Sequence, residues 1–389
     1  MDKKIKIPLS RPDITEKEIN AVLEVLKTPY LSLGPKLIEF EQKFAQYIGV
    51  KHAIAVSSGT AALHLALLSL GIGENDAVIT TPFSFIASAN CILYVRATPI
   101  FIDIDPNTYN IDPDLIEEYI ENNCDLDQQS GNPIDKKFGK RIKALLPVHI
   151  FGLPCDMDRI MHIAEKYNLF VIEDACEAIG AEYKGRKIGA SGNLATFAFY
   201  PNKQITTGEG GMIVTNNNKT ALLCRSLRNQ GRDEIGGWLD HKNLGYNYRI
   251  SEINCALGIV QLDRIEELLE KREIVASTYN DVLKNTVKIP EKINGAKRSW
   301  FVYVVCLPEK YSGLDRDRII EQLIEKGIGC NKYFPPIHFQ KFYKYLFGKK
   351  ISNYKITESI AQRTLALPFH SNIEKAQIQY VCKILKEII

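Results

Sequence analysis

The chain has 389 residues, of which 49 are basic and 46 acidic, for a formal net charge of +3. This balance excludes the strongly basic surface typical of nucleic-acid binding, and the length favours two domains over one. The nine cysteines form no Cys-x-x-Cys pair and the seven histidines form no zinc motif, so we expect neither disulfides nor a metal. The lack of a Walker loop or full Gly-x-Gly-x-x-Gly motif argues against ATP and dinucleotide cofactors.

Two segments bear on where the protein is located. Residues 1–8 are charged and carry no apolar segment, so no secretory signal is predicted. The apolar run 53–73 contains His64 and a Ser-Ser-Gly-Thr break, which favour a buried strand and helix over a membrane span. With an odd number of cysteines, these features predict a cytoplasmic protein without membrane contact.

The first half of the chain alternates predicted strands and helices. Thr15 to Glu18 forms a capping box before a helix through about Lys27, and Pro35 opens a second helix through about Tyr47. A wound α/β domain is indicated by strands at 78–80, 99–104, 144–148 and 169–172 and helices at 85–94, 113–122 and 156–168.

The polar segment 122–141 lacks apolar periodicity, so we interpret it as a surface insertion and as the best candidate for a mobile loop. A long helix over 251–285 is predicted to bridge into a smaller α+β domain. The large domain then covers residues 1–269 and the small domain 270–389. Within the small domain we predict a strand at 299–307 and helices at 315–326 and 373–388.

A lysine between an apolar strand and a glycine cluster is the most informative feature. An ordinary lysine amine is protonated at neutral pH, so Lys203 needs a desolvated or cationic site to attack a carbonyl. The predicted strand 169–172 continues into Glu173 and Asp174, at an edge where ligands of α/β sheets gather. Pyridoxal phosphate (PLP) chemistry requires such a carboxylate and lysine, which makes Asp174 and Lys203 the candidate pair. Taken singly, each is more typical of a turn cap or a solvated lysine.

A third element is the turn Ser57-Ser58-Gly59-Thr60 between a short strand and a helix. Free backbone N–H groups and the helix dipole make such a turn an anion site, and Gly59 allows close approach. A cofactor phosphate fits this position. Alone, the sequence is equally typical of an N-cap.

Segments in this order resemble the DegT/DnrJ family of sugar aminotransferases across nearly the whole chain. They are Leu33–Pro35, Ser57–Leu63, Glu173–Ala178, Tyr200–Gly211, Gly245–Arg249 and Tyr333–His338. The resemblance implies PLP-dependent transferase fold type I, an α/β class. Its large domain has a mostly parallel central sheet wrapped by helices, and a smaller α+β C-terminal domain follows. It also implies a homodimer with shared active sites.

The resemblance implies roles for individual residues. Lys203 bonds to the cofactor aldehyde and moves the proton between cofactor and sugar, while Asp174 pairs with the pyridinium. Phe85 stacks on the ring, and Asn247 reaches the phosphate of the other subunit's cofactor. The implied cofactor-binding set is Ser58, Gly59, Thr60, Phe85, Asp174, Glu177, Lys203 and Asn247. Ser32, Arg249 and His338 are the candidates for substrate binding.

Two positions depart from the family's commonest pattern. Ala198 stands where many relatives place a phosphate-binding serine, so one phosphate contact comes from elsewhere or is absent. Glu177 stands where glutamine or histidine is frequent, near the cofactor's phenolic oxygen. An ionised Glu177 cannot donate a hydrogen bond to that oxygen, so the side chain is either protonated or turned away.

By resemblance, the expected activity is transfer of an amino group from L-glutamate to a nucleotide-linked keto-deoxysugar for surface polysaccharide or glycoconjugate synthesis. Glu209 in Thr-Gly-Glu-Gly-Gly resembles the enzymes that aminate NDP-4-keto-6-deoxyhexoses. A 3-keto sugar and a non-catalytic PLP- or nucleotide-binding regulator remain alternatives. So does an isomerase, lyase or cysteine desulfurase on the same fold, for which Cys124 is the candidate thiol. Lys203 argues against the family's dehydratases, which carry histidine there.

Overall fold

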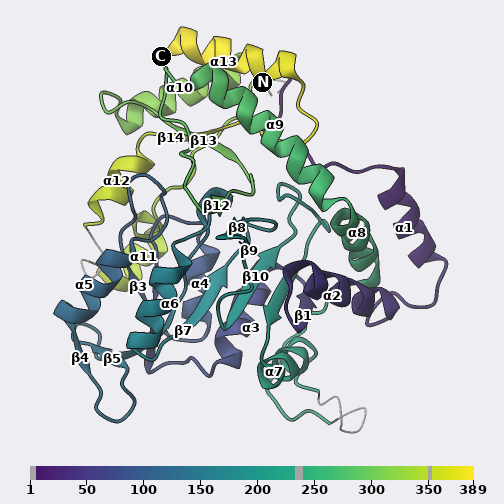
Figure 1. The fold of residues 1–389 in the computed structure, drawn as a ribbon, viewed down its shortest axis with the longest axis vertical. Helices are drawn as coiled ribbons and strands as arrows, with labels where there is room; N and C mark the ends of the chain where they lie inside the picture. Colours follow the sequence, from purple (N-terminus) through teal and green to yellow (C-terminus); the bar gives the residue numbers. More distant parts are fainter. Residues whose placement is uncertain (1–5, 233–239, 349–352) are drawn as a thin grey trace.

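The computed structural model shows a mixed central sheet covered by helices, with a smaller α+β unit at one end (Figure 1). The structure describes residues 6–232, 240–348 and 353–389. Residues 1–5, on which the prediction of a chain without a secretory signal partly depends, lie outside these ranges.

The two N-terminal helices form where they were predicted. Helix α1 covers Glu16–Leu26, and Thr15 and Glu18 make the reciprocal hydrogen bonds of a capping box. Helix α2 covers Pro35–Ile48, with proline at its first position and Gly49 at φ 85° closing its end.

The central sheet has the strand order β1-β11-β10-β7-β6-β2-β3. Neighbours from β10 to β3 are parallel, whereas β11 is antiparallel to both β1 and β10, so the predicted mostly parallel sheet is confirmed. The strands are β1 His52–Val56, β2 Asp76–Thr80, β3 Thr98–Phe101, β6 Lys140–Leu145, β7 Phe170–Asp174, β10 Leu194–Ala198 and β11 Gly211–Thr215.

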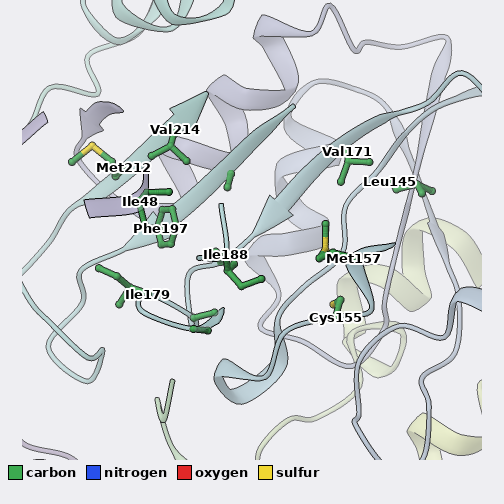
Figure 2. Packing of buried hydrophobic residues seen from close by; sticks show 14 of the residues in the cluster. Ile48, Leu145, Cys155, Met157, Val171, Ile179, Ile188, Phe197, Met212 and Val214 are labelled. Carbon is green, nitrogen blue, oxygen red and sulfur yellow. The ribbon is translucent and has the colours of Figure 1, made fainter. Parts of the chain in front are cut away.

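Alternate strand residues enter two hydrophobic cores, one on each face of the sheet. Val171 lies in one core and Ile172 in the other. Figure 2 shows Val171, Phe197 and Val214 in the first core, with Met157 of a covering helix. That face is covered by α2, α5 (Pro113–Asn123), α6 (Met157–Lys166) and α8 (Glu252–Asp263), and the other by α3 (Gly59–Ser69), α4 (Ala87–Tyr94) and α7 (Asn218–Arg228).

The apolar run 53–73 forms β1 and the buried helix α3, as predicted. Within the described ranges, no helix combines the length and apolarity needed to cross a bilayer.

Several predicted boundaries were wrong. The segment 122–141 contains regular structure: β4 (Cys124–Leu126) and β5 (Pro133–Asp135) form a hairpin, and β5 pairs with β6. Asp135 is fully buried and accepts hydrogen bonds from Tyr119 and the N–H of Phe138. Strands of three polar-flanked residues give no periodic signal, so the sequence did not reveal this hairpin. Strand β6 begins at Lys140 and not at the predicted residue 144, so its first residues are charged.

The predicted bridging helix is two helices, α8 and α9 (Ile265–Leu283), that meet at Arg264. Helix α9 runs from the central sheet into the smaller unit (Figure 1). There, β13 (Tyr303–Cys306) pairs with β14 (Thr364–Leu367) and packs against α10 (Gly313–Glu325) and α13 (Lys375–Ile388). The domain boundary at 269/270 stays a prediction. The remaining elements are β8 Glu182–Tyr183, β9 Arg186–Lys187, β12 Ala296–Lys297, α11 Lys341–Phe347, α12 Lys355–Ala361 and the short 3-10 helices Ile150–Gly152 and Ile337–Phe339.

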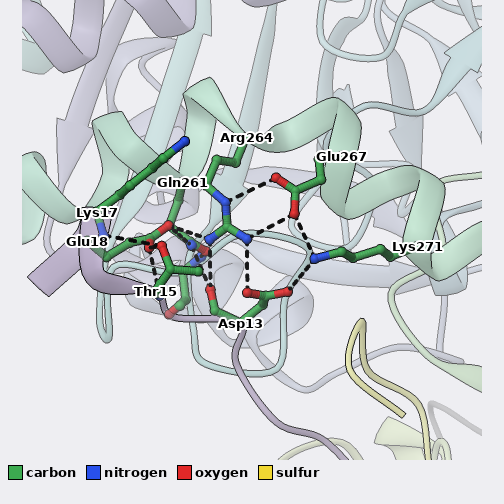
Figure 3. Close-up of polar contacts among 9 residues, drawn as sticks. Asp13, Thr15, Lys17, Glu18, Gln261, Arg264, Glu267 and Lys271 are labelled. Carbon is green, nitrogen blue, oxygen red and sulfur yellow. Dashed lines mark hydrogen bonds and ion pairs between the residues drawn. The ribbon is translucent and has the colours of Figure 1, made fainter. Parts of the chain in front are cut away.

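A buried polar cluster joins the start of α1 to the junction of α8 and α9 (Figure 3). Arg264 donates to Glu18 at 2.6 Å and to Asp13 at 3.0 Å, and Gln261 donates to Glu18 at 2.8 Å. We call Asp13, Thr15, Glu18, Gln261, Arg264, Glu267 and Lys271 the Arg264 cluster.

Candidate active site

A pocket of about 390 Å³ lies where the carboxyl ends of β7 and β10 meet the start of α3. Parallel strands place their carboxyl ends at one edge, which is why residues far apart in sequence meet here. The pocket lining brings together seven of the predicted site residues: Ser58, Gly59, Thr60, Phe85, Asp174, Glu177 and Lys203.

The start of α3 provides an anion site at one side of this pocket. Ser58 caps the helix by accepting a hydrogen bond from the N–H of Ala61 at 3.1 Å. Among the described residues, the N–H groups of Gly59 and Thr60 have no acceptor. A Cβ at position 59 would lie 2.6 Å from the Cβ of Ala198 and 3.0 Å from the sulfur of Cys176, so only glycine fits. Two free donors at a helix N-terminus suit a phosphate.

Strand alternation separates the two acidic residues at the end of β7. Asp174 lines the pocket, and its Oδ2 accepts a hydrogen bond of 2.7 Å from Ser88, whose hydroxyl lies 2.9 Å from that of Ser84. Glu173 is fully buried on the opposite face, where its Oε2 lies 3.2 Å from Nε2 of His149. Asp174 is therefore the carboxylate that a ligand in the pocket meets.

Lys203 extends into the same pocket from the turn after β10. Its Nζ lies 3.9 Å from the centroid of the Phe301 ring and 3.9 Å from Oε1 of Glu177. The lysine side chain is only 13% exposed. An aromatic face and one carboxyl group are thus the immediate surroundings of the amine.

The geometry decides how Glu177 lies. Its side chain is not turned away, because Oε2 accepts a hydrogen bond from the N–H of Phe151 at 2.9 Å and Oε1 faces Lys203. Burial raises the pKa of Glu177 to about 7, against the opposing effects of Lys203 and the Phe151 N–H. Near neutral pH Glu177 is therefore protonated in a large fraction of the molecules, and the protonated form can donate to a phenolic oxygen.

Four predicted residues lie outside the pocket of the single chain. Ser32 bridges to Ser251, and Arg249 donates to Oδ1 of Asn229 at 3.0 Å, close to the exposed Asn247. His338 is buried, with Nε2 3.0 Å from Oε1 of Glu358. Their proposed contacts with cofactor or substrate stay predictions.

The structure adds residues that the sequence did not reveal. Ser84 and Ser88 form the hydrogen-bonded chain to Asp174, and Phe301 covers Lys203 from a segment about a hundred positions away. No local motif marks these residues. Ser84 directly precedes the predicted ring-stacking residue Phe85 and Ser88 follows it by three positions, so their nearness to Phe85 was the only available signal. Cys124, the candidate desulfurase thiol, is buried in β4 and does not line the pocket.

The residues of the pocket fit PLP. The free N–H groups at the start of α3 suit its phosphate, Asp174 suits a protonated ring nitrogen, and the Lys203 amine suits its aldehyde. Phe85 lines the pocket with its side chain 59% exposed, which leaves a ring face for stacking. Asn202 is also in the lining, and its buried Oδ1 has no hydrogen-bond partner among the described residues.

Known proteins resemble this chain over nearly its whole length. It is 39% identical to GDP-perosamine synthase of Caulobacter vibrioides, with 99% of this chain and 98% of that protein covered. It is 35% identical to the spore coat polysaccharide biosynthesis protein SpsC of Bacillus subtilis, with 98% and 97% covered. The PLP form of the putative sugar aminotransferase Spr1654 from Streptococcus pneumoniae superposes with a TM-score of 0.88 at 28% identity, covering 98% of both chains.

The model of the DegT/DnrJ/EryC1/StrS aminotransferase family matches residues 12–386. The enzymes of this family are PLP-dependent sugar aminotransferases, and the mixed sheet covered by helices described above is that of fold type I. The chain belongs to the DegT/DnrJ/EryC1/StrS aminotransferase family.

Proposed function

We propose that this enzyme transfers the amino group of L-glutamate to an NDP-4-keto-6-deoxyhexose for surface polysaccharide or glycoconjugate synthesis. The observation that carries the proposal is that the Lys203 amine and the Asp174 carboxylate line one pocket with the anion site of α3. The name of one relative, GDP-perosamine synthase, supports an amino sugar bound to a nucleotide. The name of another, a spore coat polysaccharide biosynthesis protein, supports polysaccharide synthesis. Glu209 lies in the pocket lining, and its segment resembles that of the enzymes that aminate the 4-keto position, which supports this position here.

The chain's own groups divide the work. When bound, PLP supplies an aldehyde that carries the amino group and a ring that accepts electrons. Asp174 would hold the proton of the ring nitrogen, and Ser88 keeps that carboxylate oriented. Lys203 takes a proton from the α-carbon of the donor and later gives one to the sugar carbon. Glu177 offers its proton to the phenolic oxygen, and Phe301 shields the amine from water.

A homodimer with shared sites would account for Asn247 and Arg249, which lie outside the pocket of the single chain. Asn247 is exposed on the surface that also carries Arg249, whereas the ring of Phe85 stands open at the pocket. The exposed apolar side chains Ile19, Leu23 and Leu26 of α1 give a second copy a surface to cover. We also infer a cytoplasmic location, because all nine cysteines are unpaired.

The function is tested with purified enzyme, PLP and a panel of substrates. L-glutamate is expected to bleach the aldehyde-form absorbance, and an NDP-4-keto-6-deoxyhexose is expected to restore it. Restoration by 3-keto sugars alone would overturn the ring position. No response to any amino donor, with PLP bound, would favour a non-catalytic binding protein.

Shared sites are tested by mixing two inactive variants. Lys203→Ala lacks the amine, and Asn247→Ala lacks the proposed contact to the other subunit's cofactor. In a 1:1 mixture about half of the dimers are hybrids with one of two sites intact, so the mixture should regain up to about a quarter of the wild-type activity. Sites built within one chain would regain none, and a fully active monomer in sedimentation would contradict the dimer.

A further inference from the structure

Three polar side chains on α8 and α9 hold the main chain of the loop that carries Lys203. Asn254 donates to the carbonyls of Thr207 and Glu209, both at 2.8 Å. Gln261 accepts from the N–H of Thr206 at 3.2 Å. The third side chain is Arg272, and it bonds to the loop at the lysine itself.

Arg272 binds carbonyl groups from two segments. Its Nη2 donates to the carbonyl of Lys203 at 2.9 Å, and its Nη1 donates to those of Trp300 and Phe301, each at 3.2 Å. The guanidinium group also lies over the Phe369 ring, 5.6 Å from its centroid. The planar fork thus fixes Lys203 relative to the segment that supplies Phe301.

This arrangement is costly for a residue with a merely structural role. Arg272 is 3% exposed and forms no ion pair within the described part of the chain. Burial lowers the pKa of Arg272 to about 10, so the side chain still carries its charge at neutral pH. A buried charge without a carboxylate partner costs free energy, which the three carbonyl groups and the Phe369 ring offset only in part.

We propose that Arg272 is a positioning residue that fixes the Lys203 amine against the Phe301 ring by binding the main-chain carbonyls of both residues. The 3.9 Å separation of Nζ from the ring centroid follows from this anchorage. Lysine at position 272 keeps the charge, but its single ammonium group does not reproduce the fork. The inference rests on the proposed role of Lys203.

The test measures how fast the cofactor-free protein captures PLP. The bond is followed by absorbance, trapped with borohydride and mapped by peptide analysis. Arg272→Lys should slow capture at Lys203 by about tenfold or more, because small misplacements of a reacting group are costly. Arg316→Lys is the matched control: Arg316 is also buried and binds two carbonyls, those of Ala361 and Thr364, away from the pocket. It should capture PLP at the wild-type rate.

A double-mutant cycle tests whether Arg272 acts through Phe301. Phe301→Leu alone should also slow capture. Arg272→Lys should then slow capture by a smaller factor in the Phe301→Leu background than in the wild-type background. If Arg272→Lys does not fold, slow capture by Phe301→Leu still supports the positioned ring, and normal capture overturns it. Equal rates for the two arginine variants, or fully additive effects, overturn the proposal. If borohydride traps PLP on another lysine of the wild-type protein, the proposed role of Lys203 is contradicted instead.

Discussion

The pKa values of two buried glutamates of this protein are shifted in opposite directions. Glu18 in the Arg264 cluster is 1% exposed, and Glu177 in the Lys203 pocket is 5% exposed. Burial alone raises the pKa of a carboxyl group in both places. Hydrogen bonds from Thr15, Arg264 and Gln261 more than offset this at Glu18 and lower its pKa to about 2. Glu177 keeps a pKa of about 7.

The number and distance of donors account for the difference. Glu18 accepts hydrogen bonds from both the N–H and the hydroxyl of Thr15 and from two further side chains. Glu177 accepts one backbone hydrogen bond, and its nearest cation lies 3.9 Å away. The comparison teaches that a buried carboxylate with hydrogen-bond donors for both oxygens stabilises the fold. A buried carboxyl group with few donors remains able to exchange a proton in a reaction.

The largest effect is expected when the pocket loses the Lys203 amine. Lys203→Ala should reduce amine transfer by more than about a thousandfold, because among the described residues no other lysine lines the pocket to accept the cofactor aldehyde. The rate of the glutamate half-reaction measures this. Lys271→Ala is the matched control, since Lys271 also faces a carboxylate, Asp13, at 3.2 Å, but in the Arg264 cluster. Equal losses in both variants would contradict the assignment of Lys203.

Removing the cation of the other region should affect stability instead. Arg264→Met leaves Glu18 and Asp13 buried without their shared guanidinium, which should lower the free energy of unfolding by about 3–5 kcal/mol. Urea unfolding of the cofactor-free protein at pH 7 measures it. The half-exposed partner Glu267 serves as control, because Glu267→Gln should cost less than about 1 kcal/mol. A loss below 1 kcal/mol in Arg264→Met would show that the cluster stabilises little.

The two glutamates should give opposite pH slopes. The pKa of Glu177 is raised in the folded state from 4.5 to about 7, so its stabilising contribution is complete below 4.5 and is lost as the pH rises through 7. Glu177→Gln should therefore be more stable than the wild type by up to about 3 kcal/mol at pH 8, with the gain lost by pH 5.

Glu18 supplies the opposite arm of this experiment. Its pKa is lowered from 4.5 to about 2, so its contribution of about 3 kcal/mol is present above pH 4.5 and disappears as the pH falls towards 2. Glu18→Gln should be less stable than the wild type at pH 7 and approach it in acid. Unfolding at several pH values in cofactor-free protein checks both variants. Parallel pH profiles would refute the comparison.

The smallest effect concerns a single donor. Thr15→Ala removes the hydroxyl that donates to Glu18 but keeps the backbone N–H, which donates at 2.8 Å. We expect a loss of about 1 kcal/mol in the free energy of unfolding, typical of an N-cap. A loss as large as that of Arg264→Met would mean that the donors act as one unit.

Sequence reasoning was most successful where chemistry is local. The turn Ser58 to Thr60, the end of β7 and Lys203 each carry their own signal, and the parallel sheet brings them together. The fold was predictable because strands and helices alternate with clear periodicity. Contacts such as Phe301 over Lys203 or Arg264 with Glu18 join distant segments and depend on tertiary packing, which leaves no local pattern. The hairpin β4–β5 was not predicted, because strands of three residues are too short to show a periodic pattern.

One thiol in the pocket has a practical consequence. Eight of the nine cysteines are buried, and Cys176 is the partly exposed one, in the lining beside Gly59. Burial raises the pKa of this thiol, so alkylation of the folded enzyme should be slow and favoured by alkaline buffer. Because Cys176 lines the pocket, a bound ligand should cover its thiol, and the rate of labelling by a small alkylating reagent should fall as the pocket fills. That rate reports occupancy without any enzymatic assay.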